Sequence, residues 1–167
     1  MSETVNFIID AVVIGTGATL VMDLWALLQK RLFSIPSLDY GMVGRWIGHL
    51  PHGHFIHRPI MASPKVTGET VIGWSAHYLI GILFAGILIF ITDPEWIKAP
   101  TFFPALAMGV GSIIAPFFIL QPGMGAGIAA RKTPVPMTAR LRSVIAHTSF
   151  GVGLYVAALL ASQRAVF

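Results

Sequence analysis

Residues 71–92 read VIGWSAHYLIGILFAGILIFIT, and this stretch decides the fold of the chain. It contains no lysine, arginine, aspartate or glutamate, and it is long enough to cross a bilayer, which takes about 20 apolar residues. Three other stretches are comparably long and apolar, at about 5–29, 102–121 and 143–162. Their apolar residues do not alternate with polar ones as barrel strands require, so we predict four transmembrane helices. We expect one all-α integral membrane domain over residues 1–167.

The overall composition excludes several other classes of protein. The chain is 55% hydrophobic and only 11% charged, whereas an ordinary soluble domain carries about 25% charged residues. Intrinsic disorder needs low hydrophobicity and high charge, so it is excluded as well. The chain has no cysteine, which rules out disulfides and thiolate metal sites. The predicted partner is therefore the lipid bilayer.

The basic residues indicate how the chain is threaded. Nine of the eleven lysines and arginines lie in the predicted loops 30–70 and 122–142. Cytoplasmic loops carry such an excess, so both loops are expected in the cytoplasm and both termini in the periplasm of a bacterial inner membrane. The net charge of +4 is gathered in these loops and not on a soluble face, so we expect no nucleic-acid partner.

The two halves of the chain resemble each other. The second predicted helix contains His77-x-x-x-Gly81, and the fourth contains His147-x-x-x-Gly151. Glycine pairs recur in the first and third helices, as Gly15-x-Gly17 and Gly109-x-Gly111. The pattern predicts two parallel-repeat hairpins, with a long histidine-rich loop between helices 1 and 2. The alternative is chance, because small residues are common in membrane helices.

Polar residues from several predicted helices share one depth. With a rise of about 1.5 Å per residue, Asp23, His77 and His147 all lie a few residues from the cytoplasmic ends of their helices. Ionisable residues at such depths are costly, usually face the bundle interior, and are functional candidates. We expect these three side chains to converge, with Glu69 at the rim and His57 folding over the site.

The chemistry of this group leaves several readings open. Two histidines and a carboxylate suit a transition metal, for which the candidate ligands are Asp23, Glu69, His77, His147 and His57. His77 and His147 are also candidate axial ligands of a haem, and the same residues are able to hold a proton. The structural alternative is that they only hydrogen-bond neighbouring helices together.

The first long loop has two features of its own. It contains His49-x-x-His52-x-His54-x-x-His57, a density of imidazoles that either binds metal or forms a polar hairpin at the membrane surface. Arg45 and Trp46, earlier in the loop, are candidates for contact with lipid phosphates and the membrane interface.

No catalytic motif assigns an enzymatic reaction. The chain lacks a Gly-x-Ser-x-Gly elbow, a His-Glu-x-x-His motif and a dinucleotide-binding fingerprint. The glycine-rich stretch 123–127 is not followed by Gly-Lys-Ser/Thr, so it is interpreted as a flexible exit from the third helix. We therefore expect binding or transport of a metal ion, haem or proton. The alternatives are an accessory subunit of a membrane complex and a metal-dependent membrane enzyme, and a homo-oligomer remains open.

A set of motifs spread over the chain carries a resemblance. They are Asp23-Leu24-Trp25, Gly44-Arg45-Trp46, Glu69-x-x-x-Gly73-Trp74-x-x-His77-Tyr78, Gln121-Pro122-Gly123-Met124-Gly125 and His147-x-x-x-Gly151-x-Gly153-x-Tyr155. Together they resemble a bacterial family of small four-helix membrane proteins known only as a domain of unknown function. The resemblance implies an inner-membrane location and supplies no activity.

Overall fold

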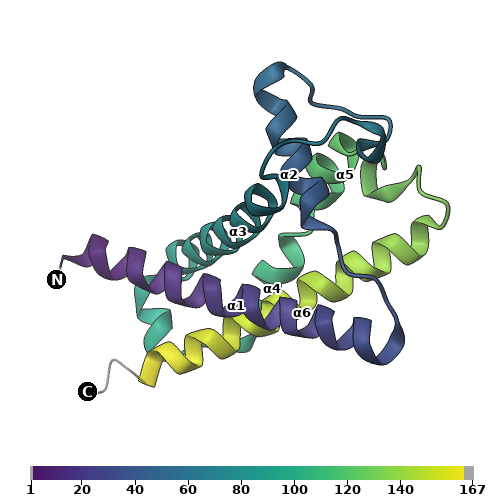
Figure 1. Ribbon diagram of the computed structural model, residues 1–167. Coiled ribbons are helices and arrows are strands. Elements are labelled where there is room, and N and C mark those ends of the chain that lie inside the picture. Colours follow the sequence, from purple (N-terminus) through teal and green to yellow (C-terminus); the bar gives the residue numbers. More distant parts are fainter. Residues whose placement is uncertain (1, 164–167) are drawn as a thin grey trace. The chain divides into compact units, whose positions relative to one another are not determined.

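The computed structural model describes residues 2–163, and the described chain is helical with no strand. Figure 1 shows its α-helices in chain order, coloured from purple to yellow. They are α1 (Glu3–Phe33), α2 (Tyr40–His49), α3 (Glu69–Thr92), α4 (Phe102–Gly111), α5 (Gln121–Gly123) and α6 (Pro136–Ser162). Four helical segments are long and apolar enough to cross a membrane: α1, α3, Phe102–Gly123 and α6. The prediction of an all-α protein with four such helices is confirmed.

Local chemistry explains where the first and last spans begin and end. The Ser2 hydroxyl accepts a hydrogen bond from the Val5 amide and caps α1. Ser34 adopts a left-handed conformation with φ 55° and ends α1. The helix therefore ends at Phe33, beyond the predicted end near residue 29. Pro136 stands at the first position of α6, where its missing amide hydrogen costs nothing, and α6 also begins earlier than predicted.

The third span is irregular. After α4, a short π-helix occupies Pro116–Leu120 and leads directly into α5. Pro116 and Pro122 lack amide hydrogens, so a regular ladder of α-helical hydrogen bonds is interrupted at both positions. The third span therefore changes its helix type instead of continuing as one regular α-helix.

The chain divides into two compact units, which we call unit 1 and unit 2. Unit 1 consists of residues 2–36, 78–112 and 146–163 among those described. Unit 2 consists of residues 37–77 and 113–145. Both α3 and α6 contribute one part to each unit, because the boundaries fall between His77 and Tyr78 and between Ile145 and Ala146.

Glycines let the helices of unit 1 approach closely. A Cβ atom added to Gly15 of α1 would lie 2.8 Å from the Gly81 carbonyl oxygen of α3. A Cβ atom added to Gly109 of α4 would collide with the backbone of Gly151 in α6. Each contact therefore requires glycine. The two contacts join the glycines matched in the predicted repeat, and the superposition of the hairpins stays a prediction.

A small apolar core fills unit 1 around these contacts. Its fully buried members include Ile14 of α1, Leu88 and Ile89 of α3, and Leu154 of α6. Ala11, Ala18, Ala105 and Ala158 complete it with short side chains. Small side chains at helix contacts allow dense packing where lipid supplies no hydrophobic drive for association.

Unit 2 contains a helix where the sequence suggested only a loop. Between α1 and α3 the chain forms α2, capped by the Asp39 carboxylate accepting from the Gly41 amide at 2.8 Å. A Cβ atom added to Gly44 of α2 would collide with the Glu69 carbonyl oxygen, so α2 lies directly on the start of α3. Within unit 2, α2 also lies beside α5 (Figure 1), where Trp46 contacts Gly123.

Candidate functional site

Asp23 of α1 has a hydroxyl partner within unit 1. The Tyr78 hydroxyl of α3 donates to Asp23 Oδ2 at 3.0 Å, and both residues are half-buried. An ionisable side chain at a span centre costs about 2.5–3.5 kcal/mol on insertion scales, and a hydrogen-bonded partner lowers this cost. Helix α3 therefore supplies a hydrogen-bond donor to the Asp23 carboxylate.

His147 also has a hydroxyl partner in unit 1. Its Nδ1 lies 2.7 Å from Ser112 Oγ, the residue that directly follows α4. The Ser112 hydroxyl is buried and also donates to the Gly109 carbonyl at 2.6 Å. The Ser112 hydroxyl is therefore able to accept from His147 Nδ1 when that nitrogen carries a proton, or to lie beside its lone pair when it does not.

His77 has the corresponding arrangement in unit 2. The Tyr40 hydroxyl at the start of α2 lies 2.9 Å from His77 Nε2. The two rings also stack, with centroids 4.2 Å apart, and Trp74 packs against both. The loop between α1 and α3 therefore returns to cover His77 with a hydroxyl and aromatic surface.

Glu69 is held by Arg45 in an ion pair of unit 2. Arg45 donates from Nε and Nη2 to the two carboxylate oxygens at 2.8 and 2.7 Å, and the Val66 amide donates to Glu69 Oε2 at 3.0 Å. The guanidinium is buried, with 8% of its residue surface exposed. The hydrogen bonds that Arg45 donates to Glu69 raise the pKa of Arg45 above its ordinary value. Both oxygens of the predicted ligand Glu69 are thus engaged by Arg45.

The histidine-rich loop of unit 2 brings three imidazoles together. The ring of His49 lies 5.1 Å from that of His57 and 6.0 Å from that of His54, measured between centroids. His57 is buried, and its amide and its Nδ1 both face the Gly123 carbonyl, at 2.8 and 3.2 Å. His57 is thereby fixed against the turn that follows α5.

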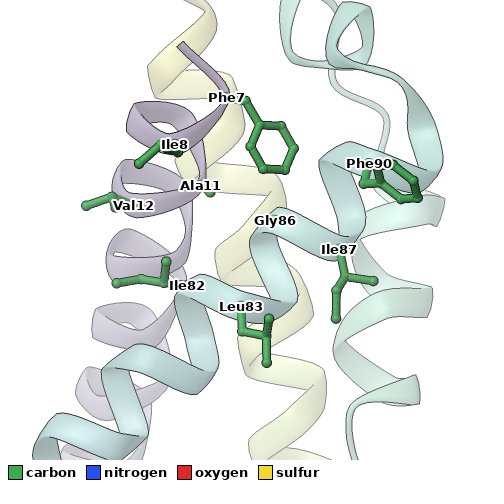
Figure 2. A pocket seen from close by; sticks show the side chains of 9 residues that line it. All are labelled: Phe7, Ile8, Ala11, Val12, Ile82, Leu83, Gly86, Ile87 and Phe90. Carbon is green, nitrogen blue, oxygen red and sulfur yellow. The ribbon is translucent and has the colours of Figure 1, made fainter. Parts of the chain in front are cut away.

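An apolar groove lies on unit 1, away from these polar side chains. Figure 2 shows it between α1 and α3, where Phe7, Ala11, Ile82 and Phe90 are among its lining residues. All of its lining residues are apolar. The groove therefore has no side chain with which to recognise an ion or a proton.

The predicted site residues are thus distributed over both units. Asp23 and His147 belong to unit 1, and Glu69, His77 and His57 belong to unit 2. Over residues 2–163, no group of three or more His, Cys, Asp or Glu side chains has the arrangement of a metal site. The convergence of Asp23, His77 and His147 stays a prediction.

Sequence reasoning named the titratable residues and missed their partners. Tyr78, Tyr40 and Ser112 supply the hydroxyls, and they lie between 35 and 55 positions away along the chain. The available signal for Tyr78 was its position, since it directly follows His77 within an apolar span. No comparable signal marked Tyr40, which lies outside the predicted spans.

Comparison with known proteins gives one result. No curated protein and no solved structure matches the chain. One family model does, over residues 12–161, and its description is "protein of unknown function (DUF2938)". The match covers most of the chain, in agreement with the resemblance found from the motifs. The chain is therefore a member of the DUF2938 family, and its described residues 2–163 form four helices apolar enough to cross a membrane.

Proposed function

We propose that this protein binds and releases protons at polar side chains of its membrane helices. The observation that carries the proposal is the pairing of three titratable side chains with hydroxyl groups. Asp23 pairs with Tyr78, His77 with Tyr40 and His147 with Ser112, at 2.7 to 3.0 Å. A hydroxyl both donates and accepts, so each pair keeps its hydrogen bond whether the titratable group carries its proton or has lost it.

The contrast with Glu69 sharpens this argument. Glu69 is paired with a guanidinium, which is always charged and only donates, so its carboxylate is fixed in the ionised form. The hydroxyls of Tyr78, Tyr40 and Ser112 themselves carry no charge. A change of proton at Asp23, His77 or His147 therefore leaves the hydroxyl hydrogen bond possible, whereas a proton on Glu69 would disrupt its ion pair with Arg45. Of the metal ion, the haem and the proton that the sequence left open, the hydroxyl pairs favour the proton.

The location that accompanies this proposal is a bacterial inner membrane with both termini in the periplasm. Support comes from the charges of unit 2, where seven of the eleven lysines and arginines lie, against only two acids, Asp39 and Glu69. An excess of basic residues favours the cytoplasmic side. The loops 30–70 and 122–142 would then lie on the cytoplasmic side.

A second candidate is an accessory subunit or homo-oligomer without proton chemistry. The third span favours it, because only 17% of that span is buried within the chain, against 39% of the span in α6. A poorly covered helix faces either lipid or another protein. In this case the hydroxyl pairs would serve only to join helices.

The test of proton binding is an infrared titration of the full-length protein in liposomes. A protonated carboxyl group in a membrane span absorbs apart from the amide bands, and its signal disappears when the proton is lost. We expect a carboxyl band that changes with pH, disappears in Asp23→Asn and changes frequency in Tyr78→Phe, which loses the hydroxyl.

Asp10→Asn is the matched control, because Asp10 lies on the same helix and is also half-buried. This variant should keep the band assigned to Asp23. A spectrum of Asp23→Asn that titrates like the wild type, or a wild type without any pH-dependent carboxyl band, would contradict the proposal and favour the accessory subunit.

A further inference from the structure

The buried ring of His57 in unit 2 has one nitrogen that the fold leaves without a partner. His57 Nδ1 faces the Gly123 carbonyl oxygen at 3.2 Å, and only 7% of the residue is exposed. A carbonyl oxygen only accepts hydrogen bonds, so Nδ1 carries the proton. In the neutral ring Nε2 then presents a lone pair, and it has no hydrogen-bond partner among the described residues. A buried acceptor of this kind requires an explanation.

In the neighbouring His49, too, one ring nitrogen faces a backbone carbonyl oxygen. Its Nε2 faces the Pro64 carbonyl oxygen at 3.0 Å, so Nε2 carries the proton and Nδ1 presents the lone pair. Histidines that bind metals almost always donate their other ring hydrogen to a carbonyl or a carboxylate, which fixes the tautomer and the ring orientation. Both histidines already have this outer support from the backbone.

The separation of the two rings fits one shared ion. When two imidazoles bind one Zn²⁺ tetrahedrally at about 2.1 Å, their centroids lie about 5 Å apart. The centroids of His49 and His57 are 5.1 Å apart, with the ring planes inclined at 63°. The rings are therefore not stacked in parallel, an arrangement that would keep the two lone pairs from one shared ion.

Hydrogen bonds to the backbone of unit 2 hold the segment that carries His57 in place. The His57 amide donates to the Gly123 carbonyl at 2.8 Å, and the Ile60 amide donates to the Met124 carbonyl at 3.0 Å. On the other side, the Trp46 indole donates to the Phe55 carbonyl at 2.9 Å and ties the loop to α2. The segment 55–60, which carries His57, is therefore held against residues 123–124 on one side and against α2, which carries His49, on the other.

We propose that His49 and His57 bind a divalent transition metal ion such as Zn²⁺, Co²⁺ or Ni²⁺, through His49 Nδ1 and His57 Nε2. Imidazole nitrogen suits these metals. Because the protein supplies two firm ligands, water completes the coordination and the ion is exchangeable, unlike the ion of a closed structural site. The site goes beyond the proton proposal, since neither histidine belongs to the three hydroxyl pairs.

The test is a Co²⁺ titration of the full-length protein in detergent, followed by visible absorption. The protein is purified through an affinity tag that contains no histidine, because a histidine tag would bind the probe. We expect one Co²⁺ per chain, displaced by Zn²⁺. His49→Ala and His57→Ala should each weaken binding about ten-fold or more, since even the loss of an outer partner costs 10–100-fold.

His52→Ala is the matched control within the same loop, because His52 is exposed and has no ring contact with His49 or His57. It should bind Co²⁺ as the wild type does. Equal weakening in His52→Ala and His49→Ala would overturn the proposal in favour of unspecific binding by a histidine-rich loop. So would unchanged binding in His49→Ala with His57→Ala combined.

The buried position of His57 raises the risk that its variant unfolds, so His49→Ala, at a half-buried position, carries the decision in that case. A second measurement is the melting temperature with and without Zn²⁺. A bound ion stabilises the folded state, so Zn²⁺ should raise the melting temperature of the wild type and not that of His49→Ala. An equal rise in both would overturn the assignment to His49.

Discussion

Replacing Gly109 by alanine is expected to destabilise the protein by about 3 kcal/mol or more, at the upper end of overpacking costs. The added Cβ atom would collide with the Gly151 backbone and lie 2.7 Å from the His147 carbonyl oxygen. All of these neighbours are backbone atoms, so no side-chain rotation relieves the contact. Helices α4 and α6 would have to separate, and the Ser112–His147 hydrogen bond would lengthen with them. Unfolding in mixed detergents, followed by circular dichroism, measures the loss.

Gly111 provides the control on the same helix. It is exposed, and a Cβ atom added there meets nothing within 4 Å. Alanine favours helix over glycine by about 1 kcal/mol, so Gly111→Ala should be neutral or slightly stabilising. If Gly109→Ala is as stable as Gly111→Ala, the close approach of α4 and α6 described above is wrong.

Replacing Arg45 by alanine is expected to release the loop of unit 2 and to lower the melting temperature by several degrees. Removing the guanidinium leaves the Glu69 carboxylate half-buried and without its partner, which is more costly than losing both members of a pair. Because Arg45 also donates to the Ser63 carbonyl, the segment 50–68 loses an anchor. Limited proteolysis of the full-length protein in detergent should then cleave within that segment.

Two further variants separate this effect from a general loss of charge. Arg45→Ala combined with Glu69→Ala should be more stable than Arg45→Ala alone, since no carboxylate is left unpaired. Lys98→Ala removes a cation whose pair with Glu95 is exposed, at 67% and 71% of the two side chains, and should change little. Equal melting temperatures for Arg45→Ala and Lys98→Ala would show that the Arg45–Glu69 pair does not hold unit 2 together.

The four spans were predictable because their signal is local. Each is a continuous apolar stretch of sufficient length, and hydropathy needs no knowledge of neighbouring helices. Helix α2 was not predictable in this way. It is ten residues long, and its stability depends on the contact of Gly44 with Glu69 and on the Arg45–Glu69 pair, which join positions more than 20 residues apart. A helix of this length is marginal without such contacts.

The hydrogen-bond partners of the candidate residues were not predictable from the sequence, and the role of those residues stays a prediction. Ionisable residues are rare in apolar spans and are therefore easy to recognise in the sequence. The helix rise then gives the expected distance of Asp23 and His147 from the ends of their helices. Hydrogen-bond partners depend on how each helix is rotated and which helix lies next to it, and sequence spacing alone supplies neither. Tyr78 reaches Asp23 because α3 lies beside α1, and Ser112 reaches His147 because α4 lies beside α6.

The protonation of His147 and His77 is the property that tests the proton-binding proposal most directly. It is measured by ¹⁵N NMR of the histidine side chains in the full-length protein between about pH 5 and 8. Both imidazoles are predicted to gain a proton reversibly as the pH falls. Ser112→Ala, which removes one hydrogen-bond partner of His147, should move the titration of His147 and leave that of His77 unchanged, and Tyr40→Phe should do the reverse. Imidazoles that remain in one protonation state throughout, or that titrate alike with and without their hydroxyl partners, would contradict the proposal that these pairs exchange protons.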